Sequence, residues 1–176
     1  MKRIAILTRD CGGVNAAIRA VVRTAVAEGL AVDGVMRGFH GLIRGDFVPL
    51  DRRSVSNIIG LGGTILKTAR AEEFLAEAGQ KAALAHLRER AVDGLIVIGG
   101  NGSLTGARVL AETYGFPVVG IPATIDNDVP GVAYSIGADT AVDVALDALD
   151  KIRDTATSLE RIFVVEVMGR KCGWLA

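Results

Sequence analysis

The amino-acid sequence predicts an α/β domain with a doubly wound, mostly parallel sheet in a three-layer arrangement. Short, fully apolar runs alternate with longer segments of helical periodicity, which is typical of a parallel sheet covered by helices on both faces. Most of the apolar runs end in turns rich in glycine or aspartate. The chain of 176 residues has no internal repeat, low-complexity linker or block of like charges, so we expect one domain over residues 1–176.

The first half of the chain is predicted to contain two strands and two helices. Residues 4–8 form an apolar run that ends at the turn 10–13, and Asn15 precedes a segment whose apolar residues recur at helical spacing. A second strand is expected over residues 31–36. After a polar stretch, an alanine-rich helix is expected from about residue 72 to residue 90.

The second half repeats the order of strand, turn and helix. The apolar residues 95–98 lead into a glycine-rich turn and a helix that we expect Ser103 to cap. The apolar residues 118–121 lead into an acidic loop and a helix over about 139–153. A last strand is expected over residues 162–167.

Charge and cysteine content narrow the classes of partner. Twenty basic and 20 acidic residues leave a net charge of zero, so nothing favours nucleic acid or an anionic membrane as the main partner. Cys11 and Cys172 are too far apart in sequence for a typical disulfide scaffold or zinc site. No apolar run approaches the roughly 20 residues that span a bilayer, and no long apolar leader precedes the first strand. We expect a soluble, cytoplasmic protein that binds a small metabolite.

Asp126 and Asp128 follow the strand 118–121 and are the most informative pair of residues. In an extended loop the side chains at positions i and i+2 project to the same side, so both carboxylates can face one cavity. Carboxylates so close repel each other unless a metal ion, a cation or a substrate proton lies between them, which suits base catalysis or magnesium binding. A turn in which Asp and Asn side chains cap their own backbone is an equally good interpretation.

Three further loops are expected at the same edge of the sheet, because each follows a strand at its carboxyl end. The segment 99–103 supplies glycines and a helix N-terminus, as a phosphate site requires, although it matches no standard nucleotide motif and a plain tight turn is the alternative. Gly12 precedes a second helix N-terminus, for which simple capping is the alternative. Arg70 is either a phosphate ligand or a solvated arginine.

Arg19 and Arg23 share one helix face, which is either solvated or part of an anion pocket.

Taken together, these loops resemble the amino-terminal half of an ATP-dependent 6-phosphofructokinase of the bacterial type. Seven ordered blocks carry the resemblance: Asn15-Ala16-Ala17-Ile18-Arg19, Gly62-Gly63-Thr64, Thr68-Ala69-Arg70, Ile98-Gly99-Gly100-Asn101-Gly102-Ser103, Thr124-Ile125-Asp126-Asn127-Asp128, Lys151-Ile152-Arg153-Asp154-Thr155 and Glu166-Val167-Met168-Gly169-Arg170. The resemblance implies that residues 1–176 form the nucleotide-binding lobe of this fold, without the second lobe. It also implies phosphoryl transfer from MgATP to the 1-hydroxyl of fructose 6-phosphate in glycolysis, with ATP and Mg²⁺ as cofactors, in a homo-oligomer.

The resemblance further implies roles for individual residues. The implied catalytic residues are Asp126, as the base that accepts the hydroxyl proton, with Thr124, Asp128 and Arg170 beside it. The implied sugar-phosphate ligands are Met168, Gly169 and, from a neighbouring subunit, Arg161. The implied nucleotide ligands are Gly12, Arg70, Gly102, Ser103 and Gly106, with Asn101 at the magnesium position. The implied allosteric residues, which would bind a nucleotide between subunits, are Arg19, Arg23, Arg52 and Arg153.

Three positions bear on the chemistry of this particular chain. A small residue at Gly102 is typical of the ATP-using branch of the family, whereas the pyrophosphate-using branch carries an aspartate. The opening loop is two residues shorter than is usual in the family and carries Arg9, which either blocks the nucleotide site or replaces a lost contact. Asn101 replaces an aspartate that serves the magnesium ion, and so it lacks the full negative charge that a hard cation prefers.

Two other functions are open on the sequence. Arg9, Asn101 and the shortness of the chain suggest a catalytically degraded domain that binds nucleotide or phosphate as a regulator, or a partner subunit for an intact homologue. A dinucleotide-binding oxidoreductase is disfavoured because no G-x-G-x-x-G motif follows a strand.

Overall fold

The computed structural model describes residues 1–169 and 171–176, and its centre is a five-stranded sheet. The strands are β1 (Arg3–Thr8), β2 (Ala31–Val35), β3 (Phe47–Leu50), β4 (Gly94–Gly99) and β5 (Val118–Pro122), in the order β3-β2-β1-β4-β5. Strands β1, β2, β4 and β5 are parallel, and β3 pairs antiparallel with β2. The prediction of a mostly parallel sheet is confirmed, and its four parallel strands lie where the apolar runs were recognised.

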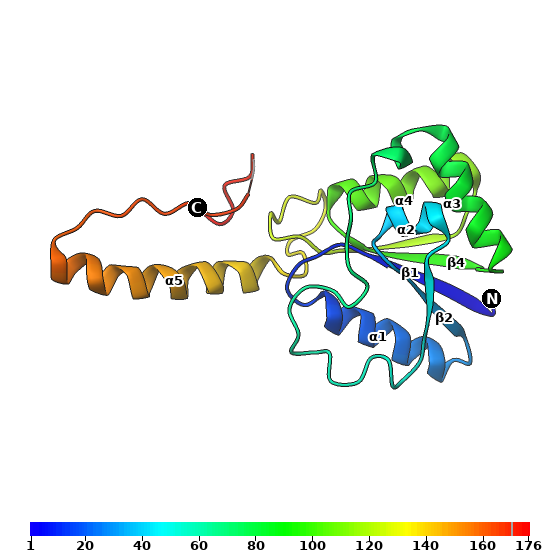
Figure 1. The fold of residues 1–176 in the computed structure, drawn as a ribbon, viewed down its shortest axis with the longest axis horizontal. Helices are drawn as coiled ribbons and strands as arrows, with labels where there is room; N and C mark the ends of the chain where they lie inside the picture. The colour runs from blue at the N-terminus through cyan, green and yellow to red at the C-terminus, as the bar shows by residue number, and fades with distance from the viewer. Residues whose placement is uncertain (170) are drawn as a thin grey trace.

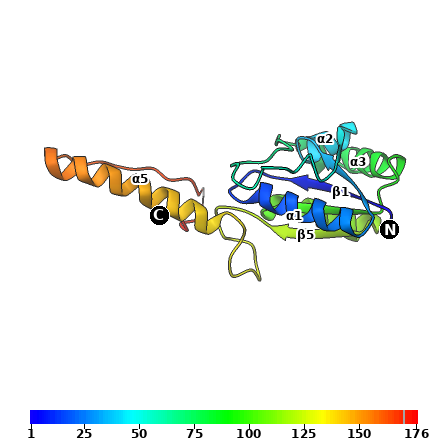
Figure 2. The ribbon, with the colours of Figure 1, turned by 90° about the horizontal axis from the view of Figure 1, so that it is seen from below.

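Helices cover both faces of this sheet. They are α1 (Val14–Ala27), α2 (Phe39–Arg44), α3 (Glu77–Glu89), α4 (Asn101–Tyr114) and α5 (Ala138–Leu159), with a short 3₁₀ helix, η1, over Glu72–Leu75. Figures 1 and 2 show α1 on one face of the sheet and α2 and α3 on the other. The three-layer arrangement expected from the sequence is therefore present.

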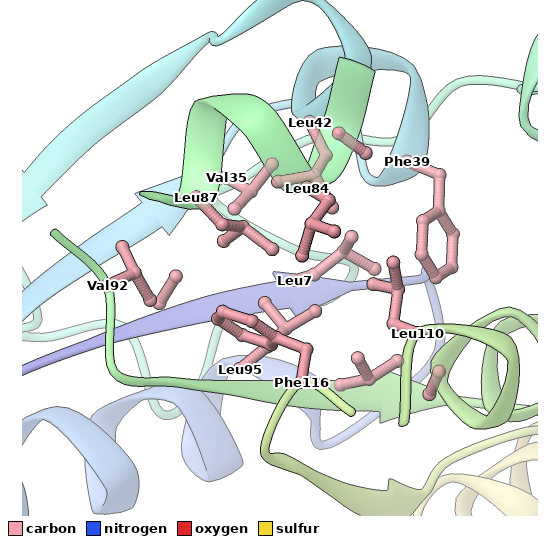
Figure 3. Close-up of a cluster of buried hydrophobic side chains, with 14 of the residues drawn as sticks. Leu7, Val35, Phe39, Leu42, Leu84, Leu87, Val92, Leu95, Leu110 and Phe116 are labelled. Atoms are coloured by element: carbon pink, nitrogen blue, oxygen red, sulfur yellow. The ribbon is translucent and has the colours of Figure 1, made fainter. Parts of the chain in front are cut away.

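The alternation of side chains along β1 explains the two layers of core. Ala5 and Leu7 point into the cluster beneath α2, α3 and α4, while Ile4 and Ile6 point into the cluster beneath α1. Figure 3 shows Leu7 within the first of these clusters, beside Leu84, Leu87 and Leu95. Burial of each large apolar side chain in these clusters stabilises the fold by about 1.5–3 kcal/mol, so the two clusters hold the sheet edge that carries the loops in place.

The predicted strand over residues 162–167 is wrong. This segment is extended but pairs with no strand, and Ile162 and Val164 are 96% and 97% exposed. The reason is its position, because α5 leads the chain away from the sheet before this segment begins (Figure 1). An apolar β-prone sequence forms a ladder only where another strand offers its N–H and C=O groups.

Two helix predictions also need correction. The helix expected over 72–90 is interrupted at Ala76, which is extended at φ −89° and ψ 144°, so that η1 and α3 are separate. Ser103 does not cap α4, which begins at Asn101 after Gly100 and has no side-chain cap. Ser103 lies inside the first turn and is buried. Strand β3 and helix α2 were not predicted, because both are short and lack a clear period.

Helix α5 stands apart from the body of the fold. Only Ala138 is buried along its length, and Val144, Leu146 and Leu149 are exposed. After α5 the chain runs back along the helix toward the body (Figures 1 and 2). Among the described residues, no helix combines the length and the apolar character needed to cross a membrane.

Candidate active site

A cavity of about 1400 Å³ lies where the carboxyl ends of β1, β4 and β5 meet. The segments that line it are the loop after β1 (9–12), the glycine pair 62–63, the turn and first residues of α4 after β4 (100–103) and the loop after β5 (123–126 with 128). The four loops singled out in the sequence therefore converge on one space, as expected for the carboxyl edge of a parallel sheet. Residues 168, 169, 171 and 172 close part of its rim.

The acidic loop, defined here as residues 123–136, brings Asp126 and Asp128 to the cavity. The loop is not extended between them, because Asn127 has a left-handed backbone at φ 48°. Asn127 Oδ1 accepts a hydrogen bond from the backbone N–H of Ser135 at 2.8 Å, and its Nδ2 donates to Ala133 O at 3.0 Å. The extended geometry assumed from the sequence is thus wrong, and a turn held by Asn127 presents both carboxylates instead.

Thr124 orders the start of this loop. Its Oγ1 accepts a hydrogen bond from the backbone N–H of Asp126 at 3.2 Å, and its carbonyl accepts one from Ser135 Oγ at 2.7 Å. Asn101, the first residue of α4, donates from Nδ2 to the backbone carbonyl of Asp128 at 3.2 Å. The turn after β4 and the acidic loop are therefore joined directly, with the backbone of Asp128 beside the first residue of α4.

The start of α4 is open to an anion. Gly100 is the N-cap residue, no side chain caps the helix, and the backbone N–H groups of its first turn lack intrahelical partners. No atom lies within 4 Å of a Cβ added at Gly102, so the approach to this backbone is free. Ser103 also lines the cavity. Such a terminus favours negative charge through its N–H groups and its dipole.

An apolar wall, formed by Phe39, Phe74, Gly106 and Val109, lines another part of the cavity. The rings of Phe39 and Phe74 are 4.2 Å apart between centroids, and a Cβ added at Gly106 would lie 2.8 Å from Phe39 Cζ. The absence of a Cβ at Gly106 therefore lets the ring of Phe39 pack directly against α4. Neither phenylalanine was predicted as a site residue, because nothing in the local pattern distinguishes a phenylalanine on a cavity wall from one in the core.

The carboxyl-terminal segment contributes a further part of the rim. Met168 and Gly169 line the cavity, as does Lys171, which the sequence analysis missed. Cys172 Sγ donates to the backbone carbonyl of Asp126 at 2.8 Å, which ties this segment to the acidic loop. Arg170 lies outside the described residues.

The remaining predicted ligands of nucleotide and sugar phosphate have different positions. Gly12 lines the cavity, and Arg70 is an exposed residue between Ala69 and Ala71, both of which do. Arg161 follows the exposed end of α5 and does not line the cavity.

The four predicted allosteric arginines are only partly brought together. Arg19 donates from Nη1 to the backbone carbonyl of Val55, so α1 is tied to the loop that carries Arg52. Arg23 lies one turn further along α1 and is exposed. Arg153 pairs with Asp150 at 3.2 Å on α5, which leads away from α1 (Figure 1). The structure thus ties Arg19 to the loop that carries Arg52, and α5 carries Arg153 away from α1.

Cys11 lies in the cavity wall but is not a reactive group at neutral pH. Burial, together with the negative charge of Asp10, raises the pKa of the Cys11 thiol to about 11. Its Sγ donates to Ile136 O at 3.3 Å, so the thiol helps to hold the acidic loop against the loop after β1. A thiol with so high a pKa is a structural hydrogen-bond donor and a poor nucleophile or metal ligand.

Comparison with known proteins agrees with this architecture. Residues 3–176 match the sequence profile of the phosphofructokinase family. The chain is 56% identical over 178 aligned positions to ATP-dependent 6-phosphofructokinase 1 of Thermus thermophilus, an alignment that covers 100% of this chain and 55% of that protein. It is 54% identical to the ATP-dependent 6-phosphofructokinase of Thermotoga neapolitana, with 100% and 56% covered. The chain therefore spans about half the length of the curated relatives it matches.

Solved structures show the same fold. The phosphofructokinase of Saccharomyces cerevisiae matches with a TM-score of 0.90 and 39% identity, over 100% of this chain and 27% of that chain. A pyrophosphate-dependent phosphofructokinase from Marinobacter aquaeolei matches with a TM-score of 0.83 and 22% identity, over 99% of this chain and 48% of that chain, which shows likeness of fold alone. With residues 3–176 matched by the family profile and with relatives more than half identical over its full length, the chain belongs to the phosphofructokinase family.

Proposed function

We propose that this chain is the nucleotide-binding part of an ATP-dependent 6-phosphofructokinase, which transfers a phosphoryl group from MgATP to the 1-hydroxyl of fructose 6-phosphate. The observation that carries the proposal is the cavity, in which an acidic loop faces an uncapped helix N-terminus. The chain is 53–56% identical to proteins named ATP-dependent 6-phosphofructokinase, and Gly102 is the small residue expected of an ATP-using member.

The apolar and polar parts of the cavity lining favour one orientation of the nucleotide. Its base would lie on the apolar wall that includes Phe39, Phe74 and Val109. Its phosphates would lie at the start of α4, over Gly102 and Ser103, with Gly12 on the opposite side. Arg70 stands beside this space and would offer a planar guanidinium to a phosphate.

Transfer requires positioning and neutralisation of charge more than covalent chemistry. Asp126 would accept the proton of the attacking hydroxyl, because it lines the cavity that the start of α4 also lines. Thr124 holds the backbone of Asp126, and Asp128 adds a second carboxylate. Arg170 is proposed, from its place in the family motif, to stabilise the transferring group.

The residues around Asp128 fit a magnesium ion that is held mainly by the nucleotide. Asn101 and Asp128 are joined by a hydrogen bond and line the cavity, so their oxygens would supply one or two ligands. Mg²⁺ usually takes its other ligands from phosphates and water. Within the described residues no three His, Cys, Asp or Glu side chains are grouped as a metal site of their own. The ion would neutralise phosphate charge, while Asn101 and Asp128 orient it.

Sugar phosphate would bind at the rim, where Met168 and Gly169 line the cavity. Arg161 stands away from this cavity, which is consistent with a role toward a neighbouring subunit in a homo-oligomer. The surface of Arg19, Arg23 and Arg52 would bind an allosteric anion, with Arg153 reaching it only from a different arrangement of α5 or from another subunit.

A regulatory role is the second candidate. The neutral side chain of Asn101 favours a domain that binds nucleotide without transferring phosphate, either alone or as the partner of an intact homologue. Both the kinase and the regulatory domain would bind nucleotide, but only the kinase would form fructose 1,6-bisphosphate.

The test combines calorimetric titration with MgATP and a coupled assay for fructose 1,6-bisphosphate. Transfer above background that falls by about a hundredfold or more in Asp126→Asn supports the kinase, since removal of a general base commonly has this effect. MgATP binding without product, at any magnesium concentration, supports the regulatory role. If MgATP does not bind, both functions are excluded.

A further inference from the structure

Arg9 spans the cavity between two of its loops. Its backbone N–H donates to Ile98 O at 2.9 Å, which continues the sheet past the end of β1. The side chain then passes over Gly99, where an added Cβ would lie 3.2 Å from Arg9 Cγ. At its far end Nη1 donates to the backbone carbonyl of Ala69 at 2.9 Å. The guanidinium is therefore held at one side of the cavity.

Most of the hydrogen-bonding capacity of this guanidinium is unused. A guanidinium carries five N–H donors, and Arg9 directs one of its groups to the Ala69 carbonyl. Among the described residues no carboxylate lies within ion-pair distance of it. Its neighbours on the cavity wall include Ser103, which follows the uncapped turn, and Gly12. A permanent positive charge with free donors beside such a turn suits an anion with several oxygens.

The geometry also decides between the two effects that Arg9 was expected to have. A blocking arginine would fill the space in front of the start of α4. Instead the bond to Ala69 O draws the guanidinium to the side, Gly102 stays open, and a cavity of about 1400 Å³ remains.

We propose that Arg9 is a nucleotide-binding residue that contacts the polyphosphate chain through its guanidinium while Ala69 O holds it in place. The proposal rests on the nucleotide-binding function proposed above. Its consequence concerns magnesium. Because Asn101 is neutral, Asp128 is the charged residue at the magnesium position, whereas Arg9 supplies positive charge directly, so the site should bind metal-free ATP as well as MgATP.

The test is titration of the 176-residue chain with ATP, once with excess Mg²⁺ and once with EDTA. The informative variant is Arg9→Gln, which keeps a donor for Ala69 O and removes the charge, and Arg9→Ala removes both. Arg108→Ala is the matched control, because Arg108 is an exposed arginine of α4 that pairs with Glu112 outside the cavity. Circular dichroism and thermal unfolding establish that each variant is folded.

We expect the unaltered chain to bind ATP in EDTA, and Arg9→Gln and Arg9→Ala to bind it about tenfold or more weakly, as for loss of a charged hydrogen bond. With Mg²⁺ the loss should be smaller, and Arg108→Ala should match the unaltered chain in both media. Equal affinity of the unaltered chain and folded Arg9→Gln in EDTA overturns the role of Arg9 and leaves the proposed function intact. Tighter ATP binding by Arg9→Ala than by the unaltered chain also overturns the role of Arg9, because it would show that the arginine side chain blocks the nucleotide site. If the unaltered chain binds ATP in neither medium, the proposed function fails and the role of Arg9 fails with it.

Discussion

Replacing Asn101 by aspartate should change nucleotide affinity in opposite directions with and without magnesium. Asn101 is the first residue of α4, and its Nδ2 donates to the backbone carbonyl of Asp128 at 3.2 Å. In Asn101→Asp an acceptor oxygen replaces this donor, so the link to the acidic loop is lost. At the same time the site gains one negative charge beside the expected phosphate position.

The effect on the folded chain alone should be small. Loss of the hydrogen bond costs about 0.5–1.5 kcal/mol. A carboxylate in the first turn of α4 regains about 0.3–1 kcal/mol from the helix dipole. These contributions nearly cancel, so the free energy of unfolding should change by less than about 1 kcal/mol. A larger change in the free energy of nucleotide binding would therefore arise from the binding site and not from loss of stability.

The effect on binding follows from Coulomb repulsion. Two unit charges about 4 Å apart interact by about 1 kcal/mol in water and about 4 kcal/mol near a protein surface. Since Asn101 is exposed, the lower figure applies, and Asn101→Asp should bind metal-free ATP about fivefold more weakly. With Mg²⁺ present the carboxylate becomes a charged oxygen ligand, and affinity for MgATP should rise by about the same factor or more.

Isothermal titration calorimetry of both proteins with ATP, in excess Mg²⁺ and in EDTA, measures the four affinities. Asn57→Asp is the matched control, because it adds the same charge at an exposed, left-handed residue outside the cavity. A change of the same sign in both media would refute the assignment of Asn101 to the metal position, as would an equal change in the control.

Three further predictions concern stability and reactivity. Burial raises the pKa of Asp33, but its hydrogen bonds and ion pairs with Arg90 and Arg3 outweigh this effect and hold the pKa below its usual value. Asp33→Asn should therefore cost about 2–4 kcal/mol at pH 7 in urea unfolding, a difference that shrinks as the pH falls through the lowered pKa; an equal difference at pH 7 and pH 3 contradicts it. Gly41→Ala places a Cβ 1.7 Å from a backbone carbonyl oxygen, whereas Gly60→Ala meets nothing within 4 Å. Thermal unfolding should show the former destabilised by about 3 kcal/mol or more and the latter little changed, and equal midpoints would contradict this. With its pKa near 11, Cys11 should react with iodoacetamide at pH 8 much more slowly in the native chain than in urea, and equal rates would show that the thiol is accessible.

Local periodicity predicted the strands and helices whose pattern of buried and exposed residues is regular along their length. The runs at β1 and β4 are apolar on both faces because helices cover both faces of the sheet there, and α1 shows its buried stripe in the sequence. The short antiparallel β3 gave no comparable signal. Its four residues alternate only partly, and its existence depends on an exposed edge of β2.

The sequence predicted which loops form the candidate site but not how their side chains are arranged. Glycine-rich and acidic segments at the carboxyl ends of parallel strands must meet at one edge, so topology brought the turn after β4 and the acidic loop together. How the carboxylates face the cavity was not predictable, because it depends on the left-handed Asn127 and its bonds to Ala133 and Ser135. The wall of Phe39 and Phe74 depends on packing between segments 35 positions apart in sequence.

The sequence by itself determined the fold class and the order of the loops, because side-chain periodicity and glycine-rich turns act over a few residues, and the resemblance of its ordered motifs to the phosphofructokinases indicated the family. Only the tertiary structure decided that Arg9 is drawn aside by Ala69 O, that residues 162–167 form no strand, and that Arg153 stands away from the other arginines. Each of these outcomes depends on which distant groups are near enough to pair. Hydrogen bonds, ion pairs and strand ladders act over a few ångströms in space, whereas the partners here are tens of residues apart along the chain.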